Sequence, residues 1–225
     1  PPLLPYLSEA DAAVQAAALH AIKALRVPEA FDPALLALAH SEAAVRREAV
    51  GVLGYLKRPQ AISALTQVAA NDTDPDVRRV AVGALGYATD STELSVHSAL
   101  SRAINDAAWQ VREEAATTFA KTRSLFGVPD LVRAMDDEYW QVRVKAARSL
   151  GKLKATAGVP ALCLATTHAV SNLRKESVIA LGEVGDPRGI VPLERALKDG
   201  DPDVRKLAKL ALTSIQMQNL MGAPT

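Results

Sequence analysis

The sequence repeats itself about every 31 residues, and this period constrains the fold more than any other feature. Residues 77–86 match the template Val-Arg-x-x-Ala-x-x-Ala-Leu-Gly in full, and residues 45–54 and 142–151 match it at all but one position. With looser copies included, the template begins at Val14, Val45, Val77, Val111, Val142, Leu173 and Val204, at intervals of 31, 32, 34, 31, 31 and 31 residues. Such regularity predicts one structural unit stacked about seven times.

Each copy of the template predicts a helix, which we call helix B of its repeat. Apolar residues fall at offsets 0, 4, 7 and 8 from its first residue, so they share one face of a helix with about 3.6 residues per turn. An Asp-Pro-Asp run precedes two copies, at residues 74–76 and 201–203. An N-cap, a proline in the first turn and negative charge near the N-terminus all favour a helix start there. The glycine at offset 9 predicts that the helix stops or bends near its end.

A second apolar stretch precedes most copies and predicts a second helix, helix A. Pro59 to Ala69 and Val191 to Leu197 are examples, and both carry proline near the start, where its missing N–H is tolerated. A lone helix pair cannot bury its apolar side, so pairs must stack. The sequence therefore predicts an all-α fold, a right-handed α–α superhelix of two-helix repeats in a single domain over residues 1–225. Residues 216–225 would form a C-terminal cap or a tail.

Composition and charge argue against several classes of function. Lys and Arg total 26 against 25 Asp and Glu, whereas nucleic-acid binders normally carry a basic excess. No apolar run approaches the roughly 18 residues that span a bilayer, so we expect no membrane partner. The single cysteine, Cys163, excludes an internal disulfide and agrees with the cytoplasm. The four histidines are scattered and no catalytic or phosphate-binding motif occurs, so we expect no catalytic residue, no metal and no cofactor.

The Asp-Pro-Asp-Val-Arg runs at 74–78 and 201–205, together with the Ala-Leu-Gly endings, resemble the HEAT-repeat superfamily. The resemblance is to its short-period bacterial subgroup in particular, the phycobilisome-lyase-type repeats, and it covers nearly the whole chain. It implies that acidic turn residues and helix B arginines join neighbouring repeats in a ladder of hydrogen bonds. Carried onto this sequence, the ladder comprises Arg46, Asp74, Arg78, Asp106, Arg112, Arg143, Arg174, Asp201 and Arg205. Gln15 interrupts it in the first repeat.

The resemblance also implies that the B helices line a concave groove where a partner binds. On the helical wheel, offsets 2 and 6 point away from the core, and offset 5 lies beside them. Gly51 and Gly83 stand mid-helix beside valines, where glycine costs about 1 kcal/mol relative to alanine. They predict either a shallow groove for a partner's helix or loop, or a close approach of neighbouring helices. The candidate groove residues are Arg47, Val50, Gly51, Arg79, Val82, Gly83, Glu113, Arg148, Lys175 and Ile179.

Trp109 and Trp140 occupy the same position in two successive repeats, two residues before the template, and Tyr139 precedes the second. We expect the two indoles to lie side by side at the start of their B helices, at the edge of the groove. Aromatic rings of this kind are common anchors of protein interfaces. The alternative is that each indole covers the turn between its own two helices, where other repeats place proline.

Three functions follow from these observations. The first is a non-enzymatic scaffold or adaptor that holds a protein partner in the groove of the B helices. The second, implied by the subgroup resemblance alone, is a subunit of a phycobilin lyase, an enzyme that attaches a tetrapyrrole. The third is a HEAT-like alkyl-base DNA glycosylase, which paired tryptophans would suit but the balanced charge opposes. We expect the scaffold; if the chain has an enzymatic role, we expect the lyase type.

Overall fold

The computed structural model of the chain describes residues 3–9, 11–88 and 94–221. Within these ranges every regular element is a helix, and no strand occurs. The all-α fold predicted from the sequence is therefore confirmed. The α-helices are α1 (Ala12–Leu25), α2 (Phe31–Ala37), α3 (Ala43–Leu56), α4 (Ile62–Asn71), α5 (Pro75–Ala84), α6 (Leu94–Ala103), α7 (Trp109–Thr122), α8 (Val128–Ala134), α9 (Trp140–Lys152), α10 (Val159–Ala165), α11 (Ser171–Val184), α12 (Ile190–Ala196) and α13 (Pro202–Met221).

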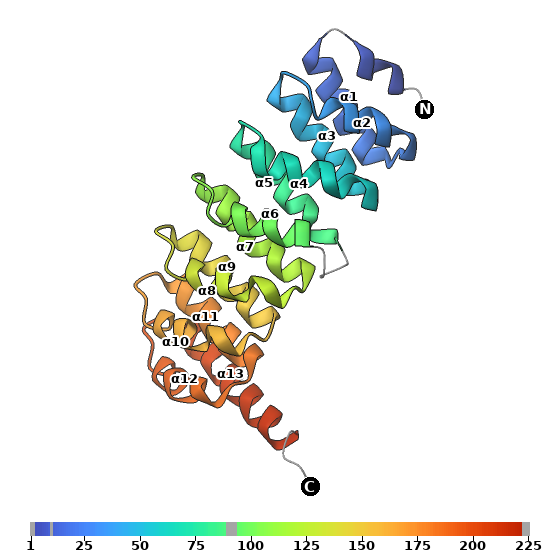
Figure 1. Cartoon of the computed structure of the whole chain (residues 1–225). Helices are drawn as coiled ribbons and strands as arrows, with labels where there is room; N and C mark the ends of the chain where they lie inside the picture. Colours follow the sequence, from blue (N-terminus) through green and yellow to red (C-terminus); the bar gives the residue numbers. More distant parts are fainter. Residues whose placement is uncertain (1–2, 10, 89–93, 222–225) are drawn as a thin grey trace. The chain divides into compact units, whose positions relative to one another are not determined.

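The chain forms two compact units, which we call the N-terminal unit (residues 1–122) and the C-terminal unit (residues 123–225). In each unit, helix A packs against the helix B that follows it, as α4 does against α5 and α10 against α11. Within each unit, successive B helices also pack against one another, as α3 does against α5 and α9 against α11. Each unit is thus a stack of helix pairs (Figure 1). The single-domain organisation stays a prediction.

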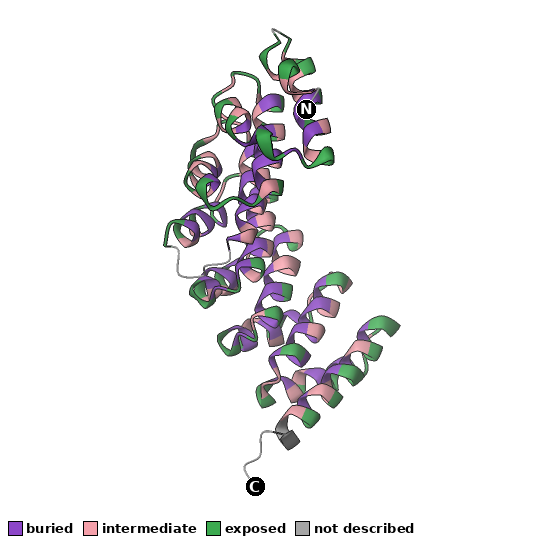
Figure 2. Ribbon diagram, turned by 90° about the vertical axis from the view of Figure 1, so that its right-hand side faces the viewer, coloured by how far each residue is buried: buried purple, intermediate pink, exposed green. Residues whose placement is uncertain are grey.

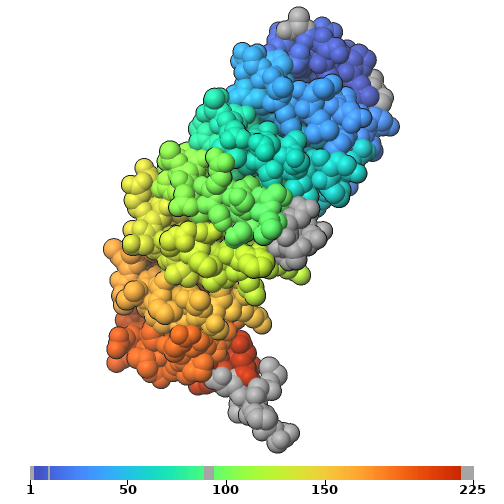
Figure 3. Space-filling view, viewed as in Figure 1, coloured from blue at the N-terminus to red at the C-terminus, as the bar shows by residue number. Residues whose placement is uncertain are grey.

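The core of each unit lies between its helices, as the purple residues of Figure 2 show. The template supplies this core, because its first residue is fully buried at Val45, Val77, Val111, Val142 and Val204. Val14 holds the same position in the first repeat but is 38% exposed, since it stands at the end of the stack. Within the N-terminal unit, stretches that follow one another in sequence form consecutive bands of colour (Figure 3), as expected where each repeat contacts its sequence neighbours.

Three B helices end later than the glycine at offset 9 predicts, whereas α5 ends at Ala84, two residues before Gly86. Gly54, Gly151 and Gly182 lie inside α3, α9 and α11. The chain leaves the helix at offset 12 instead, where a residue with positive φ ends it. The positive-φ residues are Arg26, Lys57, Arg123, Lys154 and Gly185. This stop was not recognised in the sequence because all but one of these residues are Arg or Lys rather than glycine.

At two positions the glycine at offset 9 allows one helix B to pack closely on the next. A Cβ atom added to Gly182 would lie 2.8 Å from Cα of Ala211 in α13. A Cβ atom added to Gly151 would likewise lie 2.8 Å from Cα of Ala180 in α11. Contacts this short with backbone atoms force the helices apart, so only glycine permits the observed approach.

The end of the chain extends the last helix. Residues 216–221 continue α13, and Ile215 just before them is fully buried. Nε2 of Gln218 donates to the carbonyl oxygen of Gly182 at 3.3 Å. This part of the predicted cap or tail therefore contacts the C-terminal part of α11, while residues 222–225 lie outside the described ranges.

We expect Gly182→Ala to destabilise the protein by about 1–3 kcal/mol, because the added methyl group overpacks the contact with Ala211. Gly200→Ala is the matched control, since nothing lies within 4 Å of its Cβ position. Urea unfolding followed by circular dichroism measures both variants. Equal unfolding free energies for the two would contradict the role assigned to the glycine.

Candidate functional site

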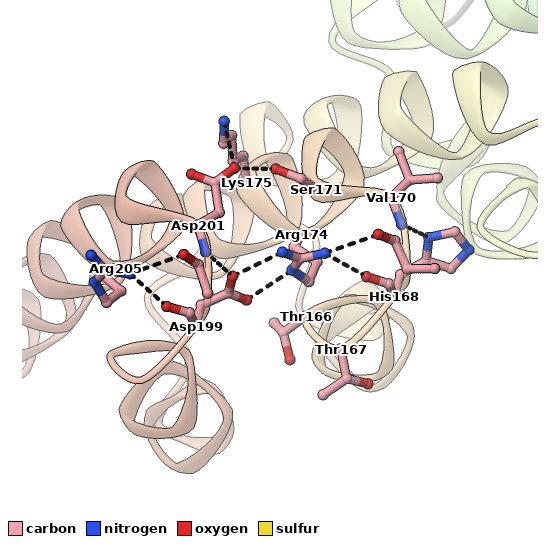
Figure 4. A network of polar contacts seen from close by, with 12 residues as sticks. Thr166, Thr167, His168, Val170, Ser171, Arg174, Lys175, Asp199, Asp201 and Arg205 are labelled. Carbon is pink, nitrogen blue, oxygen red and sulfur yellow. Dashed lines mark hydrogen bonds and ion pairs between the residues drawn. The ribbon is translucent and has the colours of Figure 1, made fainter.

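A ladder of arginine side chains joins the turns between helix A and helix B. Arg174 of α11 donates to both carboxylate oxygens of Asp199, from Nε and Nη2, each at 2.8 Å. Its Nη1 donates to the carbonyl oxygens of His168 at 2.9 Å and Ala169 at 3.1 Å. One side chain thus ties its own turn to the turn of the next repeat (Figure 4). The same arrangement occurs in the pairs Arg46–Asp72 and Arg78–Asp106.

The carboxylates of the ladder differ in part from those expected. Asp106 has the expected place, but Asp72 and Asp199 take the places expected for Asp74 and Asp201. Asp74 instead caps α5 by accepting from the backbone N–H groups of its first turn. The ladder carboxylate stands two residues before this cap, where it faces the arginine of the preceding repeat. Sequence spacing alone did not separate the two positions, because both carry aspartate.

The other expected ladder arginines also bind their own turns. Arg112 and Arg205 each donate to two carbonyl oxygens of their own turns. Arg143 of α9 donates to the carbonyl oxygen of Asp137 in its own turn. In the next turn it faces His168, which occupies the position of a ladder carboxylate. The ladder therefore changes its chemistry at this point.

Hydrogen bonds from the arginines keep the ladder carboxylates ionised. The bonds from Arg174 lower the pKa of Asp199 below its ordinary value. Burial would raise the pKa of Asp72 and of Asp106, but hydrogen bonds from their arginines and from backbone N–H groups outweigh it, and both pKa values are lowered. These bonds are absent from the unfolded chain, where the pKa of aspartate is about 3.9.

We expect the free energy of unfolding to fall as the pH drops below about 4. The folded carboxyl groups have the lower pKa, so the unfolded chain binds more protons in this range and acid favours it. The stabilisation is complete above the unfolded pKa and is lost as the pH falls toward the folded values. Urea unfolding from pH 6 to pH 2.5 measures the slope, and Asp106→Asn should reduce it. Parallel curves for wild type and variant would contradict this assignment.

An open hollow lies on the B helices of the N-terminal unit, and we call it the glycine hollow. Its volume is about 300 Å³. Helices α3, α5 and α7 contribute most of its lining, which consists of Val50, Gly51, Gly54, Arg79, Val80, Gly83, Ala84, Tyr87, Glu114 and Lys121. Several groove residues predicted from sequence are therefore brought together here.

The glycines make room for side chains of neighbouring repeats. A Cβ atom added to Gly83 would lie 2.9 Å from Oε1 of Glu114, and one added to Gly51 would lie 3.3 Å from Cδ of Lys23. In both cases the nearest atoms belong to flexible side chains and not to a helix backbone. At these glycines the hollow is lined by helix backbone without side chains. Long charged side chains surround it.

Tyr87 forms part of the wall and was not among the groove residues predicted from the sequence. Its hydroxyl is buried without a hydrogen-bond partner, and burial raises the pKa of this hydroxyl. The ammonium group of Lys57 lies 5.5 Å from the ring centroid, a cation–π contact. Tyr55 stands at the same template offset one repeat earlier, and the guanidinium of Arg26 lies 5.4 Å from its ring. This recurring tyrosine was the signal that could have revealed Tyr87.

The remaining groove candidates have other surroundings. Val82 is fully buried and does not line the hollow, so it supports the helix contact. Nε and Nη2 of Arg148 donate to the carboxylate of Glu176 at 2.7 and 2.6 Å, and Nζ of Lys175 lies 2.9 Å from a carboxylate oxygen of Asp201. Arg47 and Glu113 do not line the glycine hollow, and Ile179 is half-buried on α11.

The aromatic residues predicted as an interface edge begin two helices. Trp109 is the first residue of α7 and is half-buried. Trp140 is the first residue of α9 and is 38% exposed, and Tyr139 beside it is 39% exposed. The two indoles belong to different units, so their side-by-side arrangement stays a prediction.

Three further observations concern metal binding, membranes and the cysteine. Over residues 3–9, 11–88 and 94–221, no group of three or more His, Cys, Asp or Glu side chains could hold a metal ion. None of the helices in that part of the chain is both long and apolar enough to cross a bilayer. Burial raises the pKa of the Cys163 thiol, which reduces the thiolate fraction that a nucleophile requires.

Comparison with protein families gives one match. A sequence model described as HEAT repeats matches residues 1–86, 96–169 and 128–213, which is most of the chain. The comparison with curated proteins gives no match.

Solved structures share the fold. An engineered protein superposes with a TM-score of 0.62 at 21% identity, covering 95% of this chain and 67% of its own. The complex of CpcE and CpcF of phycocyanin lyase from Nostoc sp. PCC7120 superposes with a TM-score of 0.61 at 18% identity. The match covers 98% of this chain and 88% of that one. A structure of Kap95p with RanGDP superposes with a TM-score of 0.65 at 14% identity, covering 95% of this chain and 35% of that one. At these identities the likeness establishes the fold alone.

Proposed function

Because this chain belongs to the HEAT-repeat family, we propose that it is a protein-interaction scaffold whose partner binds in the glycine hollow. The observation that carries the proposal is the hollow itself, about 300 Å³ in volume and formed on consecutive B helices of the N-terminal unit. Repeat stacks of this kind expose extended surfaces on which partners bind. Two glycines stand where any larger side chain would reduce this space.

The lining of the hollow defines the partner's chemistry. Arg79 and Lys121 are cationic and Glu114 is anionic, and Nζ of Lys121 lies 3.0 Å from a carboxylate oxygen of Glu114. Val80 and Ala84 supply apolar surface between these charged groups. A helix or loop with one small apolar side chain and flanking polar groups has the matching composition. The buried hydroxyl of Tyr87 has no hydrogen-bond partner in the protein, so a bound group that reaches it would gain one.

The two enzymatic hypotheses have less support. The likeness to CpcE and CpcF extends to the fold, at 18% identity, and fold does not imply function. Nothing in the described site favours tetrapyrrole attachment or base excision over protein binding. We therefore propose neither of them for this chain.

We expect Gly83→Leu to abolish partner binding, because the new side chain fills the hollow. The substitution also removes a mid-helix glycine, which favours the helix by about 1 kcal/mol, so unfolding would not explain a loss. The measurement is quantitative mass spectrometry of proteins captured from the source cell by wild-type and variant chains. Arg79→Glu reverses one charge of the rim and should weaken the same interaction.

Gly200→Leu is the matched control, because Gly200 lies in the other unit with open space around it. Proteins captured by wild type and Gly200→Leu but lost with Gly83→Leu are partners of the hollow. If all three chains capture the same proteins in the same amounts, the glycine hollow is not the binding site. Thermal melts of each chain verify that it is folded.

A further inference from the structure

One rung of the arginine ladder lacks its carboxylate. Arg46, Arg78 and Arg174 each donate two hydrogen bonds to an aspartate of the next turn. Arg143 has the same place in α9, but the next turn presents the imidazole of His168. Among the residues that the structure describes, no carboxylate lies within ion-pair distance of Arg143. Its guanidinium therefore retains donor groups without an anionic acceptor.

The imidazole of His168 cannot replace the missing acceptor. Its Nδ1 lies 3.0 Å from the backbone N–H of Val170 and accepts its hydrogen bond (Figure 4). A neutral imidazole has one protonated nitrogen, so the proton is on Nε2. Nε2 lies 3.4 Å from Nη1 of Arg143. Two N–H donors thus face each other, and one oxygen atom placed between them could accept from both.

A pocket opens beside these two donors, and we call it the Arg143 pocket. It has a volume of about 390 Å³ and lies between helices α8 and α10, the A helices of two successive repeats. Val132, Met135 and Leu164 form apolar walls, and the Leu164 side chain is 78% exposed. Asp136 is the acidic residue of the lining, and it is exposed. The pocket therefore combines an aliphatic surface with the N–H groups of Arg143 and His168.

We propose that the Arg143 pocket binds an acidic side chain of a partner protein, with a bulky aliphatic side chain next to it. The carboxylate accepts from Arg143 and from Nε2 of His168 and completes the rung. The aliphatic side chain covers Leu164 and the walls beside it. The charge of the site selects this occupant, because the other rungs already show that these arginines bind carboxylates in the bidentate manner.

This site is separate from the glycine hollow. The hollow is formed by B helices of the N-terminal unit, whereas the pocket lies on A helices and a turn of the C-terminal unit. A failure of one assignment therefore leaves the other intact. A partner that uses both sites would contact both units of the chain.

The test uses the full chain and two peptides with blocked ends, Leu-Glu-Leu and Leu-Gln-Leu. We expect the Glu peptide to bind about tenfold more tightly than the Gln peptide, since the carboxylate makes charge-assisted hydrogen bonds. Titrations followed by ¹H–¹⁵N NMR measure the affinities. Long-range ¹H–¹⁵N correlation spectra of the imidazole show which ring nitrogen of His168 carries the proton. We expect Nε2 to carry the proton in the peptide-free protein and its signal to shift when the Glu peptide binds.

His168→Asp is the decisive variant, because it supplies the missing carboxylate within the chain. We expect it to raise the melting temperature by roughly 2–4 °C and to weaken binding of the Glu peptide about tenfold. A loss of binding in a more stable protein cannot result from unfolding. Asp136→Asn should tighten binding about twofold, because it removes a like charge from the pocket.

Arg46→Gln is the control, because it breaks a complete rung in the N-terminal unit. We expect it to lower the melting temperature and to leave peptide binding unchanged. Arg143→Gln should abolish the preference for the Glu peptide. Equal affinities of the two peptides for the wild-type chain, or undiminished binding by His168→Asp, would overturn the proposal.

Discussion

The close contact between B helices of successive repeats is the interaction on which the rest of the structure depends. Gly151 and Gly182 bring neighbouring backbones so near that the contact accommodates only the small residues Ala180 and Ala211. This approach closes the space around the template's buried valines and leucines, so that they share one core in each unit. A single helix pair has no such core, and each pair is therefore stable only against its neighbours.

The arginine ladder controls a different part of the same assembly. It acts at the turns, where Arg174 donates to Asp199 in the turn of the next repeat. Arg174 also donates to two carbonyl oxygens of its own turn. The glycine contacts set how near the helices come, while the ladder sets how the turns align. Where His168 replaces the carboxylate, the helix packing is retained but Arg143 faces an imidazole in the next turn. The site that we propose there needs no change of fold.

Glycine also connects packing with the candidate site. Gly151 and Gly182 face the backbone of the next helix, whereas Gly51 and Gly83 face long side chains of adjoining repeats. The second arrangement leaves the glycine hollow. Gly51, Gly83 and Arg79 were identified as groove residues from the sequence, because they lie on one face of predicted helices. Tyr87, Glu114 and Lys121 were missed, and they complete the hollow as wall and charged rim.

The sequence by itself determined the helices, their pairing and the composition of the core, because periodicity and capping act over a few residues and need no knowledge of the neighbours. Only the tertiary structure decided that Asp72 and Asp199 receive the arginines, and that the helices run past their glycines to Lys57 and Lys154. The same holds for the side chains that surround the hollow. These features depend on the distance and angle between repeats, which are set by packing across some thirty residues of chain and are not encoded in any local pattern.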